Sequence, residues 1–133
     1  DERDLAFCAY ASNLWNMFYY TFSNCLDVAR FEIEQFPFSL NRMPIEVRGK
    51  LLALSKELTK DIKQNSEIRI RHYQAAGDIK CHTINMRESK PIIDKIDEVL
   101  ASHYGFTDEE TDFIINYDIK YRMGKELNTG EDE

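Results

Sequence analysis

Apolar residues recur at helical spacing behind a proline in two parts of this chain, and this feature most restricts its fold. After Pro44, apolar residues follow one another at intervals of four, three, four and four positions. They are Val47, Leu51, Leu54, Leu58 and Ile62. One apolar stripe at this spacing predicts an amphipathic helix. Proline suits the first turn because that position needs no backbone N–H. We therefore expect a long helix from Pro44 to about Arg71.

A second helix is predicted from Ser89 to Tyr104 by the same signals. Ser89 suits the N-cap, Pro91 the first turn, and Gly105 the residue after the helix. The expected inward positions are Ile92, Ile96, Val99 or Leu100, and Tyr104.

The capping-box pattern of Thr107 and Glu110 begins a third helix. Phe113, Ile114 and Tyr117 are expected to form its buried face. Residues 117–124 are expected to form an extended or irregular tail, and residues 126–133 a frayed acidic end.

Residues 4–22 are predicted to form one helix that is apolar on nearly every side. A helix of this kind needs to be buried, so we expect a further protein surface to cover it. Trp15, Tyr19 and Tyr20 are the candidates for that interface. A short helix is expected over residues 32–36, where Pro37 ends it.

Residues 78–85 alternate between two sets of side chains and predict a short strand, which could be half of a hairpin. The expected fold is mainly α, a helical domain with one small β-hairpin or short strand element. We interpret residues 1–40 as the end of one region and residues 41–133 as a C-terminal helical region. Both are expected to belong to a larger multidomain protein.

The net charge of −7 argues against assigning nucleic-acid binding to the chain as a whole. The charge is, however, unevenly distributed along the sequence. Between Arg69 and Lys90, five Lys or Arg residues outnumber two acids, which gives +3 there and −10 elsewhere. The candidates for contact with DNA phosphates are Arg69, Arg71, His72, Lys80, Arg87 and Lys90. The alternative is that these residues are a solvated helix end and hairpin.

The three cysteines lie far apart, and an odd, scattered set fits reduced thiols in a cytoplasmic protein. No apolar run approaches the length of a membrane span. The spacing of His72, Cys81, His82 and His103 matches no structural zinc pattern, so we predict no metal.

The sequence offers no catalytic pattern, and we assign no catalytic residue. Its five glycines are isolated, so no glycine-rich loop could hold a nucleotide or S-adenosylmethionine. Acid-x-Lys triplets, which metal-dependent nucleases use, occur at residues 61–63, 78–80 and 118–120. Only the second triplet lies on a predicted strand, and chance is the better account of all three.

Three stretches resemble bacterial type II restriction-modification methylases, including the fused kind that also cleaves DNA. The stretch SKPIIDKIDEVLASHYGFTDEETDFIINYDIKYRMG, residues 89–124, resembles their C-terminal end. NSEIRIRHYQAAGDIKCHTI resembles the part before it, and NLWNMFYYTFSNCLDVARFEIEQFPFSL is similar to their target-recognition region. The resemblance covers nearly the whole chain and is strongest after Ser89.

The resemblance implies a parent enzyme that transfers a methyl group from S-adenosylmethionine to the exocyclic nitrogen of adenine in DNA. Its catalytic motif is Asn or Asp followed by two prolines and an aromatic residue, whereas Pro37, Pro44 and Pro91 are never adjacent. We therefore expect a DNA-recognition and scaffold fragment without cofactor. Its partners would be DNA, bound through the parent enzyme, and a missing N-terminal methylase domain.

Two alternatives remain open. The chain could be a structural module that braces the methylase against a cleavage or specificity unit, and self-association of the isolated fragment would favour this. A metal-dependent nuclease built on Asp78 is the other alternative.

Overall fold

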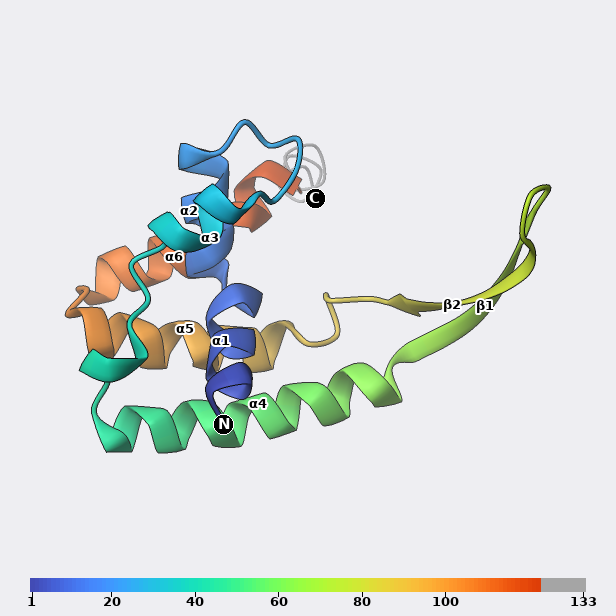
Figure 1. Ribbon diagram of the computed structural model, residues 1–133. Coiled ribbons are helices and arrows are strands. Elements are labelled where there is room, and N and C mark those ends of the chain that lie inside the picture. Colours follow the sequence, from blue (N-terminus) through green and yellow to red (C-terminus); the bar gives the residue numbers. More distant parts are fainter. Residues whose placement is uncertain (123–133) are drawn as a thin grey trace, which may run out of the picture.

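The computed structural model describes residues 1–122 and places six α-helices and one antiparallel β-hairpin within them (Figure 1). The fold class predicted from the sequence, mainly α with one small hairpin, is confirmed. The elements in chain order are α1 (Glu2–Ala11), α2 (Asn13–Phe22), α3 (Arg30–Gln35), the 3-10 turn η1 (Leu40–Arg42), α4 (Ile45–Gln64), β1 (Ser66–Tyr73), β2 (Gly77–Ile84), α5 (Lys90–Tyr104) and α6 (Asp108–Arg122).

The core lies where α1 crosses the pair formed by α4 and α5, and α2 and α6 pack together above it (Figure 1). Leu51 and Leu58 of α4 and Ile96 and Leu100 of α5 are fully buried, which confirms the two apolar stripes. Residues of both predicted regions, 1–40 and 41–133, contribute to this one core. The boundary at residue 40 stays a prediction.

The prediction of one helix over residues 4–22 is wrong, because the chain breaks at Ser12 into α1 and α2. Ser12 adopts an extended conformation, and its hydroxyl accepts a hydrogen bond from the Trp15 N–H at 3.1 Å. The carboxylate of Asp97, on α5, accepts from the N–H groups of Asn13 and Leu14. These acceptors satisfy donors that the start of a helix leaves unpaired, so a new helix begins here.

The long helix was predicted to reach Arg71, but α4 ends at Gln64 and β1 begins at Ser66. From Ser66, the chain pairs in register with β2, from Ser66 opposite Ile84 to Tyr73 opposite Gly77. The segment EIRIR alternates with a period of two and contains β-branched isoleucines, which favours a strand over a helix. The predicted strand at 78–85 is confirmed as the second strand of the hairpin.

The predicted helix boundaries near residues 89–110 are confirmed. Gly105 has a φ of +75°, as the residue after α5 requires. The Thr107 hydroxyl and the Glu110 carboxylate exchange hydrogen bonds with each other's backbone N–H groups. Ile114 is buried as predicted, but Phe113 was wrongly assigned to the buried face, since it is exposed.

The tail expected over residues 117–124 is helical as far as Arg122, which corrects that prediction. No glycine or proline occurs between Asp108 and Arg122, so nothing in the local sequence stops α6 earlier. The frayed end predicted for residues 126–133 lies outside the described residues. The short helix predicted at 32–36 is present as α3, which ends before Phe36 and Pro37.

The β1–β2 hairpin projects away from the helices into solvent (Figure 1). Its substantial packing contacts are between its own two strands. Gly77 closes the turn with a φ of +72°, and the Ala76 N–H donates to the Tyr73 carbonyl at 3.2 Å. An isolated two-stranded hairpin is marginally stable at best in water, so a surface that binds it would stabilise it.

Candidate nucleic-acid interface

The strand register sorts the side chains of the hairpin onto two faces. Residues directly opposite each other in an antiparallel pair share a face, and successive residues alternate. One face, which we call the arginine face, carries Glu67, Arg69, Arg71, Tyr73, Ile79, Cys81 and Thr83. The other, which we call the isoleucine face, carries Ile68, Ile70, His72, Asp78, Lys80, His82 and Ile84.

The arginine face holds two of the six predicted DNA-contact residues. Arg69 forms an ion pair with Glu67, with Nη2 and Oε2 3.1 Å apart, and both side chains are exposed. No ion pair involves Arg71 among the described residues, so its guanidinium is available to a partner. A shallow hollow of about 630 Å³ lies at the root of the hairpin; it is lined by Gln64, Asn65, Ser66, Glu67, Arg69, Thr83, Ile84, Asn85 and Glu88.

The isoleucine face holds two further candidates, His72 and Lys80. His72 Nδ1 lies 2.7 Å from Asp78 Oδ1, so this pair is already engaged. Ile68 and Ile70 on the same face are 63% and 65% exposed. The basic stretch of the sequence is therefore divided between two surfaces that point in opposite directions.

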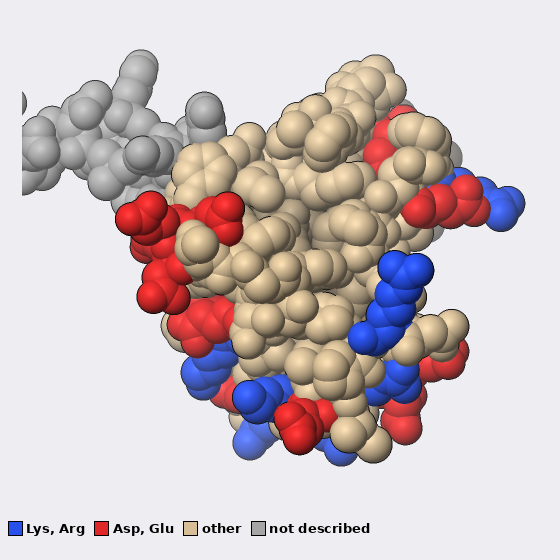
Figure 2. All heavy atoms as spheres, turned by 90° about the vertical axis from the view of Figure 1, so that its left-hand side faces the viewer, with Lys and Arg blue, Asp and Glu red and all other residues tan. Residues whose placement is uncertain are grey.

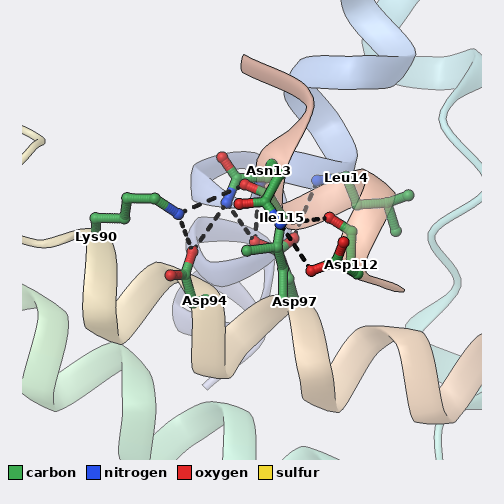
Figure 3. A network of polar contacts seen from close by, with 8 residues as sticks. Asn13, Leu14, Lys90, Asp94, Asp97, Asp112 and Ile115 are labelled. Carbon is green, nitrogen blue, oxygen red and sulfur yellow. Dashed lines mark hydrogen bonds and ion pairs between the residues drawn. The ribbon is translucent and has the colours of Figure 1, made fainter. Parts of the chain in front are cut away.

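The last two candidates lie off the hairpin. Arg87 is exposed in the connection between β2 and α5. Lys90 is the first residue of α5, and its Nζ donates to Asp94 Oδ1 at 2.7 Å and to the Ile115 carbonyl at 3.5 Å (Figure 3). Lys90 thus links α5 to α6 within the helical part of the molecule. Its contact with DNA stays a prediction, as do those of the other five.

The interface candidates of α2 differ in exposure. Trp15 packs into an aromatic cluster, with its ring centroid 4.8 Å from that of Tyr10 and 5.1 Å from that of Phe36. Tyr19 is half-buried beside Trp15, whereas Tyr20 is exposed. Much of the aromatic surface that seemed to need a missing partner is covered by this chain's own residues.

The exposed apolar surface instead lies at the end of α2, in the following loop and on α3. Phe22 is 68% exposed and Leu26 is 80% exposed, and Val28 and Phe31 are also exposed. Figure 2 shows that the upper part of the face where α2 and α3 lie is largely free of charged side chains among the described residues. Sequence reasoning missed Leu26, Val28 and Phe31, because they follow no regular spacing.

Sequence reasoning also missed the polar network around Asp97, which Figure 3 shows between α5 and the start of α2. Asp97 is 2% exposed, and its Oδ2 accepts a hydrogen bond from Asn13 Nδ2 at 2.8 Å. Burial raises the pKa of Asp97 to about 6, although the hydrogen bonds from Asn13 and Leu14 act in the opposite direction and lower it. Because Asp97 is fully engaged in capping α2, it acts as a structural acceptor. The sequence does contain a signal for this network, because Asp97 is an acid that lies within the apolar stripe of the helix predicted from Ser89 to Tyr104.

The residues considered for metal and nuclease chemistry lie apart. Asp61 accepts a hydrogen bond from the Ser89 hydroxyl at 2.6 Å, and Asp78 contacts His72. The triplet at residues 118–120 lies where side chains are not described. No group of three or more His, Cys, Asp or Glu side chains that could hold a metal gathers within the part of the chain that the structure describes.

In comparisons with protein-family models, with curated proteins and with solved structures, nothing matches this chain. None of the helices described is both long enough and apolar enough to span a membrane.

Proposed function

We propose that this chain is the DNA-recognition and scaffold part of a restriction-modification enzyme that methylates adenine N6. The methyl donor, S-adenosylmethionine, would bind to a preceding domain of the same enzyme, which works in the cytoplasm. The observation that carries the proposal is the exposed β1–β2 hairpin, which presents Arg69, Arg71 and Lys80 to solvent. The resemblance of residues 89–124 to the ends of such methylases supports the enzyme class.

Charge distribution supports the hairpin as the DNA contact. Its strands and turn, residues 66–84, carry three Lys or Arg against two acids, so they sum to +1 and the rest of the chain to −8. Phosphate repels the acidic part of the molecule and attracts the arm that extends beyond it. With so few cations, we expect weak binding that falls with salt.

The test is titration of duplex DNA at low salt with the double variant Arg71→Glu and Lys80→Glu. We expect the affinity to fall at least about tenfold, because two positive charges that attract the DNA phosphates are replaced by two negative charges that repel them. The matched control is Lys50→Glu with Lys56→Glu, which makes the same charge change on exposed positions of α4. Equal losses in both double variants, or no loss in the hairpin variant, would contradict the proposed contact.

The enzyme class is tested separately by the reading frame upstream of Asp1. We expect an Asn or Asp, two prolines and an aromatic residue there, together with a glycine-rich loop for S-adenosylmethionine. An upstream reading frame that lacks both the catalytic motif and the glycine-rich loop would contradict the proposed methylation activity.

A second candidate function is contact with another protein, and the exposed apolar residues at the end of α2 favour it. Patches of exposed apolar side chains mark interaction sites. Sedimentation of the chain should then show self-association that the double variant Phe22→Ser and Leu26→Ser abolishes. Ile45→Ser is the control, since Ile45 is 84% exposed at the start of α4. A monomer at all concentrations would contradict self-association.

A further inference from the structure

We infer that the arginine face of the hairpin enters the major groove of duplex DNA and reads guanine there, while the isoleucine face is turned away from the DNA. The inference rests on the proposed function and adds to it a reading surface, a groove and a base. It assigns base recognition to the hairpin rather than to residues 1–40.

The spacing of Arg69 and Arg71 matches the rise of DNA. The two residues are next-nearest neighbours on β1 and therefore project from the same face. Two residues of a strand advance by about 6.7 Å, and two steps of a DNA strand advance by about 6.8 Å. Because this rise is measured along the helix axis, β1 would bring the two guanidinium groups to bases about two steps apart where it runs close to that direction.

The chemistry of the face suits base edges as well as phosphates. The guanidinium of arginine binds both O6 and N7 of guanine, and this is the commonest specific contact in the major groove. The Glu67 carboxylate holds Arg69 at 3.1 Å, which restricts the orientations of that side chain. At the root of the hairpin, Thr83 on the same face adds a hydroxyl, which can pair with several bases.

The shape of the hairpin selects duplex DNA over duplex RNA. A two-stranded ribbon fits the major groove of B-form DNA, which is about 12 Å wide. The major groove of A-form RNA is too deep and narrow for side chains to read. The hairpin projects far enough from the helices that they do not flank it (Figure 1).

The isoleucine face is the poorer reading surface. It carries one Lys and one Asp, so its formal charge is zero with neutral histidines, whereas the arginine face sums to +1. Three of its side chains are isoleucines, which offer no hydrogen bond to a base edge.

The experiment compares Arg71→Ala with Lys80→Ala, which remove one unpaired cation from each face at adjacent rungs of the same hairpin. The probe is the set of duplexes that the wild-type chain retains best from a random-sequence pool. The same duplexes are also made with 7-deazaguanine, which lacks the N7 acceptor, and as RNA. Circular dichroism confirms that both variants keep the wild-type helix content.

We expect Arg71→Ala to weaken binding to the selected duplexes about tenfold or more, and Lys80→Ala about twofold. Deazaguanine should weaken binding of the wild type and of Lys80→Ala, but should add little to the effect of Arg71→Ala. Duplex RNA should bind less tightly than DNA.

Four results would overturn the inference: equal losses in the two alanine variants, no enrichment of any sequence, insensitivity of the wild type to deazaguanine, or preference for RNA. These results differ from failure of the proposed function. If the double charge reversal at residues 71 and 80 leaves DNA binding unchanged, the hairpin makes no DNA contact at all. If it abolishes binding but the two faces contribute equally, only the reading surface is wrong.

Discussion

The helical part of the molecule and the hairpin arm contrast in what holds them together. In the helical part, residues from α1, α4, α5 and α6 share one buried core, and buried polar groups such as Asp97 are hydrogen-bonded. In the arm, most side chains are exposed, and the strands contact mainly each other. The helical part is stabilised by burial of its own residues, whereas the arm has apolar and charged side chains that this chain leaves uncovered.

This difference shows where the constraints on sequence come from. Burial explains the residue types at the inward positions of α4 and α5. Burial within this chain does not explain why Ile68 and Ile70 alternate with Arg69 and Arg71 on a solvated ribbon. Contact with a partner gives a reason for that pattern, so measurements that separate the two regions bear directly on function.

The largest expected difference is in thiol reactivity. Cys8 is buried in the helical part and donates to the Leu51 carbonyl at 3.2 Å, and burial raises its pKa to about 11. At pH 8 a thiol of that pKa is only about 0.1% thiolate, and the fold must also open before a reagent reaches it. Iodoacetamide should therefore modify Cys8 at least about a thousandfold more slowly than the exposed Cys25.

Mass spectrometry of the labelled peptides measures these rates, and Cys81 on the arm should react much faster than Cys8. In guanidinium chloride the three rates should become similar. Rapid labelling of Cys8 in the native chain would contradict the buried position of α1.

A second difference is expected in stability. Leu51→Ala should lower the free energy of unfolding by about 3 kcal/mol, because Leu51 is fully buried and a cavity would remain. Ile70→Ala, on the isoleucine face, should change it by less than about 0.5 kcal/mol, because Ile70 is exposed. Urea unfolding followed by circular dichroism at 222 nm compares the two. Similar losses in both variants would mean that the arm is part of the core.

The smallest effect concerns pH and Asp97. Its pKa is raised from 3.8 to about 6 in the folded chain, so the unfolded chain loses this proton first as pH rises. The contribution of Asp97 to stability is therefore present below pH 4 and falls as pH rises through 6. Between pH 4 and pH 7, the wild type should lose about 2 kcal/mol relative to Asp97→Asn.

Urea unfolding of both proteins at the two pH values gives this difference, and carboxylates common to both cancel in it. Asp94→Asn is a useful comparison, because Asp94 is half-exposed and paired with Lys90. Parallel pH profiles for the wild type and Asp97→Asn would contradict a buried, ionisable cap on α2.

Prediction from the sequence succeeded where local signals act alone. The stripes of α4 and α5, the capping box of Thr107 and the turn at Gly105 were found because spacing and caps belong to a few neighbouring residues. The break at Ser12 was missed because it depends on Asp97, which lies 84 residues from Asn13 in the sequence. The end of α4 was placed too late although EIRIR carries a local strand signal, because helix and strand compete there and pairing with β2 decides the outcome.

The candidate site was only partly visible in the sequence. The basic residues were found as a set, but their division between two faces depends on the strand register, which sets Ile70 opposite Lys80 and Arg71 opposite Ile79. The position of Lys90 on α5, in contact with α6, depends on the packing of those helices. A count of charges along the chain contains neither kind of information.

By itself, the sequence determined that α4 and α5 are amphipathic helices, where α5 and α6 begin, and that positive charge gathers between residues 69 and 90. Only the tertiary structure decided that α1 and α2 are separate helices and that the basic residues lie on opposite sides of a projecting arm. The physical reason is range. Propensity, capping and periodicity act over a few residues, whereas hydrogen bonds such as that of Asn13 with Asp97 form only after distant segments have packed together.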